Sequence, residues 1–136
     1  MAPKLPPLLA ERSRGTEFAL LVIVPSVGGA IAGVLLGVNE IAYLVYSALA
    51  IGAGFFGGLE HRGGWNGFYR GLIGGMEFGV FILIAHGVGF DSEPKAELPD
   101  PEVLLVVITT VLGCGLGALG ARRRVKVERK AQSAEG

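Results

Sequence analysis

Four long apolar runs, separated by short polar or charged segments, account for most of the chain. The runs cover residues 18–38, 41–59, 69–90 and 103–121. Each is close to the length of about 20 residues that an α-helix needs to cross the hydrocarbon core of a membrane. Only Asn39 and Glu40 separate the first two runs, so the first two helices must be antiparallel neighbours. The pattern predicts an all-α, polytopic membrane protein with four transmembrane helices in two hairpins.

Glycine recurs at four-residue intervals within these runs, most clearly in "GGWNGFYRGLIGGMEFG" at residues 63–79. Glycine is about 1 kcal/mol worse than alanine as a helix former in water. In lipid, however, small residues let two helix backbones approach closely, and this spacing places them on one helix face. We therefore expect helix packing at Gly29, Gly33, Gly37, Gly54, Gly58, Gly71, Gly75, Gly79, Gly113 and Gly117. Such ridges serve either a tight bundle within one chain or self-association, and we expect a homo-oligomer that uses one or two of them.

Lysine and arginine are distributed unevenly, although the net charge of the 136-residue chain is zero. They occupy an N-terminal segment (1–17), the island between the second and third runs, and a basic tail (122–136). Lys95 is the only one in the loop between the third and fourth runs, which is otherwise acidic. The positive-inside rule then places both termini of the transmembrane domain (18–121) in the cytoplasm.

Soluble enzyme chemistry has little support in the composition. Half of the residues are hydrophobic, and the mean hydropathy is +0.55. The single cysteine, Cys114, excludes an internal disulfide and a cysteine-cluster metal site. The two histidines, His61 and His86, are far apart and have no ligand-spaced partner. With no nucleophile–base pair and no phosphate loop either, we expect no enzyme, no cofactor and no metal.

The third run carries ionisable residues into apolar surroundings. Glu77 lies two helical turns after Arg70 and on the same helix face, whereas His86 lies on the opposite, glycine-bearing face. An ionisable group inside a membrane costs at least about 2.5 kcal/mol and is a functional candidate. Glu77 either lines a hydrated route or anchors the helix by pairing with Arg70 or Arg62. His86 is expected mainly as a packing residue, and all three of Glu77, Arg70 and His86 are candidates for a transport site.

Aromatic and basic residues flank the apolar runs at the expected cytoplasmic side. Aromatic side chains and arginines are typical of the headgroup level of a membrane. The expected interface residues are Arg62, Trp65, Tyr69, Arg122, Arg123 and Arg124. Their expected partners are the lipid bilayer, with anionic phospholipid or a membrane protein as further partners, and not a nucleic acid. Within the first run, Pro25 removes one helical hydrogen bond, so we expect a kink and an unpaired carbonyl near Leu21.

The stretch "GAGFFGGLEHRGGWNGFYRGLIGG" resembles the glycine-rich, four-helix membrane proteins of unknown function in bacteria and archaea. The resemblance covers roughly the middle third of the chain. It implies a fold style and the plasma membrane of a prokaryote, and it implies no activity.

The residues are compatible with two functions of different kinds. The first is a homo-oligomeric channel or carrier for ions or small solutes, with Glu77 lining the route. The second is a scaffold or accessory subunit that transports nothing and uses its glycine ridges and basic tail to bind a larger membrane complex.

Overall fold

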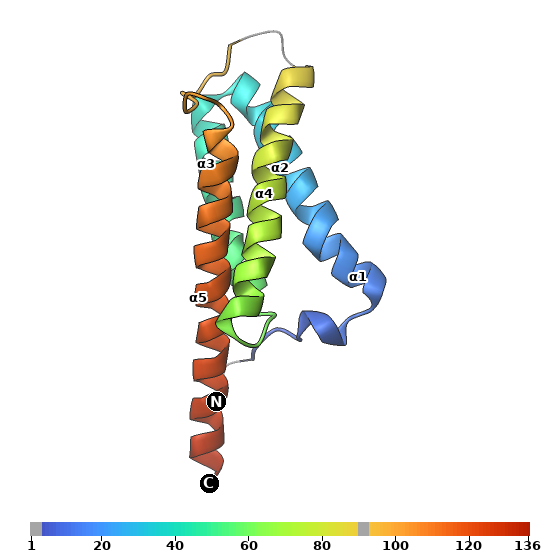
Figure 1. Cartoon of the computed structure of the whole chain (residues 1–136), viewed down its shortest axis with the longest axis vertical. Coiled ribbons are helices and arrows are strands. Elements are labelled where there is room, and N and C mark those ends of the chain that lie inside the picture. Colours follow the sequence, from blue (N-terminus) through green and yellow to red (C-terminus); the bar gives the residue numbers. More distant parts are fainter. Residues whose placement is uncertain (1–3, 90–92) are drawn as a thin grey trace.

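The computed structural model describes residues 4–89 and 93–136 and contains helices joined by short connections (Figure 1). In chain order the elements are η1 (Leu9–Glu11), α1 (Arg14–Phe18), η2 (Ala19–Ile23), α2 (Val24–Val38), α3 (Glu40–Gly58), α4 (Gly64–Gly89) and α5 (Leu104–Glu135). The elements α1, η2 and α2 follow one another without a break and form one long first helix.

Four helices are long and apolar enough to cross a membrane, which confirms the all-α class and agrees with a multi-pass membrane protein. They are Arg14–Val38, Glu40–Gly58, Gly64–Gly89 and Leu104–Glu135. The N-terminal segment from residue 4 and the C-terminal part of α5 lie at the same end of the bundle, and α5 extends beyond the other helices there (Figure 1). We call this the terminal end.

Two helices are longer than their apolar runs. α4 begins at Gly64, so the polar island forms its first turns, and α5 continues through the basic tail to Glu135. The tail contains no glycine or proline between Ala121 and Glu135 and consists largely of good helix formers such as alanine, arginine, lysine and glutamate. The Nε of Arg124 also donates to Oε1 of Glu128, one turn later, at 2.8 Å.

The turn between α2 and α3 forms at Asn39, as its short length requires. The backbone of Asn39 is extended, with a φ of −155°, and its side chain accepts a hydrogen bond from the backbone N–H of Ala42 at 2.9 Å. This N-cap ends one helix and begins the next within a single residue. A cluster of buried side chains joins α2, α3 and α4 and includes Leu36, Tyr43 and Ile82.

Close approach of helix backbones at glycine is most extensive between α4 and α5. A Cβ atom added to Gly71 would overlap the carbonyl oxygen of Gly113, and one added to Gly75 would overlap that of Thr109. A Cβ on Gly113 would in turn overlap the carbonyl of Gly71. Neither helix can carry a side chain at these positions without moving away from the other. Similar overlaps occur at Gly29, Gly33, Gly58, Gly67, Gly79, Gly117 and Gly120.

Gly54 and Gly37 differ from this pattern. In the part of the chain that the structure describes, no neighbouring atom lies within 4 Å of a Cβ position on Gly54. The expected ridge of α3 therefore makes its close contact at Gly58, against Gly117, and not at Gly54. Gly37 is buried in α2.

The first helix diverges from α3 toward the terminal end (Figure 1). α2 is held against α4 at Gly29 and Gly33, whose Cβ positions would overlap the carbonyls of Phe78 and Ile82. Below these contacts lies η2, a π-helical turn in which the N–H of Val24 donates to the carbonyl of Ala19. The divergence leaves space between α2 and α3.

Candidate functional site

The space between the diverging helices is a cavity of about 690 Å³, which we call the α2–α3 groove. Its walls come from α2, α3 and α4, and Thr109 and Gly113 of α5 contribute to its floor. Arg70 is the one charged side chain among the described residues that line it, and most of the others are aliphatic residues or glycine. The volume falls within the range of about 300–1,000 Å³ that is usual for ligand sites, and so does the combination of apolar walls with few polar groups.

Arg70 is fixed by a backbone carbonyl of the first helix. Its Nη2 donates to the carbonyl oxygen of Leu20 at 2.5 Å. The π-helical register explains why this carbonyl is free: Val24 bonds to Ala19, five residues back, so the next N–H in that register would belong to Pro25. Proline has no N–H, and the carbonyl of Leu20 is left for another donor. The unpaired carbonyl expected near Leu21 is therefore at Leu20, and a side chain from α4 satisfies it.

Two glycines make room for the Arg70 guanidinium. A Cβ on Gly74 would lie 2.7 Å from Nη1, and a Cβ on Gly57 of α3 would lie 3.8 Å from Nη2. Arg70 has five N–H donors, and its Nε is buried without a hydrogen-bond partner among the described residues. The guanidinium is thus held between three helices and keeps donors that an anion could accept from.

Glu77 and His86 lie away from the groove. Glu77 is not among the described residues that line it, and its Oε2 is buried without a hydrogen-bond partner in the described part of the chain. The ion pairs described there include none between Glu77 and either Arg70 or Arg62; Arg62 pairs with Glu128 at 3.5 Å. His86 lies beside Gly33 of α2, about 24 Å along α4 from Arg70. Of the three transport candidates, only Arg70 lines the groove.

Most of the expected interface residues are exposed at the terminal end, but Arg124 is not. Trp65 is 73% exposed and Tyr69 is 58% exposed, both on the first turns of α4. Arg62, Arg122 and Arg123 are also exposed. Arg124 is only 6% exposed.

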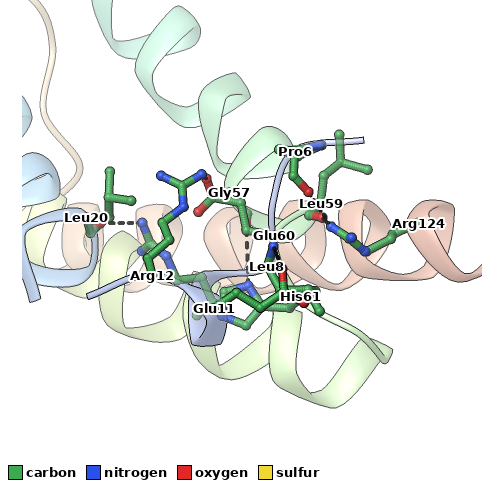
Figure 2. A network of polar contacts seen from close by, with 11 residues as sticks. Pro6, Leu8, Glu11, Arg12, Leu20, Gly57, Leu59, Glu60, His61 and Arg124 are labelled. Carbon is green, nitrogen blue, oxygen red and sulfur yellow. Dashed lines mark hydrogen bonds and ion pairs between the residues drawn. The ribbon is translucent and has the colours of Figure 1, made fainter. Parts of the chain in front are cut away.

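The buried Arg124 belongs to a polar network with the N-terminal segment (Figure 2). Its Nη1 donates to the carbonyls of Pro6 and Leu59, each at 2.7 Å. Sequence reasoning grouped Arg124 with lipid-facing arginines because its partners are backbone carbonyls, which leave no mark in a sequence. Its role in the structure is to hold three segments of the protein together.

Residues 6–12, which we call the N-terminal strap, cross the terminal end of the bundle. The N–H of Leu9 donates to the carbonyl of Glu60 at 3.0 Å, and Arg12 forms an ion pair with the Glu60 carboxylate at 2.7 Å. Next to this pair, His61 Nδ1 lies 3.2 Å from the carbonyl oxygen of Gly57 (Figure 2). Burial lowers the pKa of His61, and the contact with Gly57 partly opposes this shift. The strap could not be predicted from the sequence, because Arg12 and Glu60 are 48 residues apart along the chain.

No protein-family model, no curated protein and no solved structure matches this chain. The comparisons therefore add no family to the resemblance noted from the sequence, and function has to be inferred from the groove and the groups around it.

Proposed function

We propose that this protein is a small multi-pass membrane carrier for an anionic substrate, and that the α2–α3 groove is its substrate site. The observation that carries the proposal is a guanidinium with free donors at one end of an otherwise apolar cavity between two membrane-length helices. A guanidinium within an apolar cavity is costly unless its charge is paired, which makes Arg70 a candidate functional residue. Arg70 is the group that holds the anion.

The first helix supplies the part that moves. π-helical turns are rare and are often located at functional sites, and Pro25 lies two residues after the end of η2. The hydrogen bond from Arg70 to Leu20 ties this turn to α4. An anion that accepts from Arg70 competes with Leu20 for the same guanidinium. Binding of substrate is thereby coupled to the position of the first helix, which a carrier requires.

A second candidate route involves Glu77, and its buried, unpartnered Oε2 favours it. In a homo-oligomer a neighbouring copy would cover this face and could place Glu77 along a path for cations or protons. We propose the same orientation for both routes, with the terminal end in the cytoplasm of a prokaryotic cell, because the basic residues gather there.

Flux measurements in liposomes test the proposal. The parent protein is expected to carry anions with apolar parts, and Arg70→Gln is expected to abolish this flux. Arg70→Lys should retain only part of it, because lysine keeps the charge but loses the planar set of donors. Arg129→Gln, which removes an exposed arginine of the tail outside the groove, is the matched control and should leave flux unchanged.

The other outcomes identify which alternative holds. If Glu77→Gln abolishes flux and Arg70→Gln does not, the route runs past Glu77 and the groove proposal is wrong. If the parent protein moves no ion under any gradient, the carrier proposal fails, and the accessory-subunit function takes its place.

A further inference from the structure

We infer that the substrate of the α2–α3 groove is an anionic phospholipid from the leaflet at the terminal end, with its phosphate at Arg70 and one acyl chain along the groove. This inference rests on the proposed carrier function, because it names the substrate that the carrier would move. Binding itself can be measured without any transport.

The rim of the groove is apolar and exposed. Val24 and Val27 on α2 are 55% and 53% exposed, and Leu49 on α3 is 70% exposed, although all three line the cavity. On membrane-spanning helices such surfaces contact acyl chains. The opening between them therefore leads sideways into the bilayer, and a lipid can enter without crossing water.

The length of the groove matches one leaflet. Its lining on α3 extends from Tyr46 to Gly57, which corresponds to about 16 Å along the helix axis. This is close to half of the hydrocarbon thickness of about 30 Å, which is the depth that the acyl chains of one leaflet occupy. A small soluble anion would use only the end near Arg70 and leave the rest of the groove without a purpose.

The charged end of the groove lies near headgroup depth. Arg70 directly follows the exposed Tyr69 and lies about 7.5 Å along the helix from the exposed Trp65. Tryptophan and tyrosine concentrate at the membrane–water interface, so these two residues mark the headgroup level. A phosphate just below that level can accept hydrogen bonds from Arg70 while its acyl chain runs toward the middle of the bilayer. Guanidinium and phosphate also have matching bidentate geometry.

The surroundings favour a phospholipid over a single-chain acid. The exposed Arg62 lies just before α4, and the exposed Arg122 contacts Gly64 at the start of α4, with the exposed Arg123 next to it in the chain. These arginines attract anionic headgroups to this end of α4. The open rim between α2 and α3 leaves space for a second chain to remain in the bilayer. The proposed occupant therefore has two chains and a phosphate that carries negative charge.

The test compares retention of added lipids by the purified full-length protein, using native mass spectrometry and thermal unfolding in detergent. The probes are phosphatidylglycerol, phosphatidylcholine, oleate and inorganic phosphate. We expect phosphatidylglycerol to bind about tenfold more tightly than phosphatidylcholine, because the positive choline of phosphatidylcholine is repelled by Arg70 and cancels the net charge of that lipid. Arg70→Gln should remove most of this preference.

A matched pair of variants on α3 tests the acyl-chain part. Gly54 lines the groove and has open space around its Cβ position, so Gly54→Leu should fill the groove and weaken binding of both phospholipids. Gly52 has the same open space among the described residues but does not line the groove. Gly52→Leu should therefore bind lipid like the parent. If Gly54→Leu does not fold, Ala53→Phe, at another lining position, replaces it.

Several results would overturn the inference. They are equal effects of Gly54→Leu and Gly52→Leu, binding of oleate at least as tight as that of phosphatidylglycerol, and binding of inorganic phosphate with no lipid preference. The last result would leave a carrier of soluble anions intact. Conversely, selective retention of phosphatidylglycerol without lipid flux in liposomes would refute the carrier function and leave the lipid site standing.

Discussion

Substitution of alanine for Gly71, Gly74 or Gly115 should affect the stability and function of the protein in three different ways. Each change adds a single methyl group, yet the group meets different neighbours. On Gly71 it would overlap the backbone carbonyl of Gly113. On Gly74 it would lie 2.7 Å from Nη1 of Arg70, the far end of a flexible side chain. On Gly115 it would meet open space within the described part of the chain.

The magnitudes follow from what must move. At Gly71 two backbones have to separate, which is overpacking and costs about 1–3 kcal/mol of stability. At Gly74 the guanidinium has to withdraw until its 2.7 Å separation reaches the 3.4 Å of an ordinary contact. That movement weakens the hydrogen bond to Leu20 and so costs part of the roughly 1.5–3 kcal/mol that a charge-assisted hydrogen bond contributes to stability. The higher helix propensity of alanine stabilises the folded state by up to about 1 kcal/mol and offsets this loss. Gly115→Ala should be neutral or stabilise by up to about 1 kcal/mol.

Gly74→Ala should therefore impair function and spare stability, whereas Gly71→Ala should reduce stability. The assays are reversible unfolding in mixed micelles for stability, and anion flux and lipid binding for function. We expect about a tenfold loss of substrate affinity for Gly74→Ala, because the Arg70 donors are displaced.

Equal unfolding free energies for Gly71→Ala and Gly115→Ala would contradict the packing assigned to α4 and α5. Parent-like flux and lipid binding by Gly74→Ala would contradict the role assigned to Arg70, because this variant displaces the guanidinium while keeping the arginine.

Three further predictions concern the terminal end and the orientation. Arg124→Gln should destabilise the protein by about 2–3 kcal/mol and expose the N-terminal strap to proteolysis, since buried carbonyls lose a charged donor, whereas Arg123→Gln should do neither. Because burial lowers the pKa of His61 in the folded state, stability should be constant above about pH 6.5 and fall as the pH drops below that value. Thermal unfolding from pH 7.5 to 5 should show this fall in the parent protein and a smaller fall in His61→Gln. A cysteine replacing Glu97 should react with an impermeant reagent on intact cells and one replacing Ser133 should not; the reverse result would invert the orientation.

The four long helices and the close contacts between their backbones could be predicted, because both depend on the spacing of apolar residues and glycines along the chain. The apolar runs fix four membrane-length helices, and the two-residue break at Asn39 fixes the hairpin. The glycines at residues 71 and 75 lie at a helix contact because a four-residue period keeps them on one face of α4. Gly54 shares this spacing but makes no close contact within the described part of the chain, since the spacing cannot show where two helices diverge.

The groove was not predictable, because it depends on the register of the first helix. The sequence shows that Pro25 leaves one carbonyl without its helical donor. In an α-helix this carbonyl would belong to Leu21, four residues back. The π-helical turn makes it the carbonyl of Leu20, five residues back. Arg70 and Glu77 share a helix face, which favoured a pair between them. The structure gives Arg70 a backbone partner from another helix, and that partner cannot be read from side-chain chemistry.

Pro25 and Arg70 together form a linkage that neither residue forms alone. Without the proline, the carbonyl of Leu20 would have a backbone donor in the π-helical register, and Arg70 would have no tie to the first helix. Without the arginine, that carbonyl would have no partner that the structure describes. Because the tie is a side-chain hydrogen bond and not part of a helix ladder, an anion at Arg70 can replace the Leu20 carbonyl as the acceptor of the guanidinium. The carbonyl of Leu20 then needs a new donor, and we propose that this need drives the first helix to move.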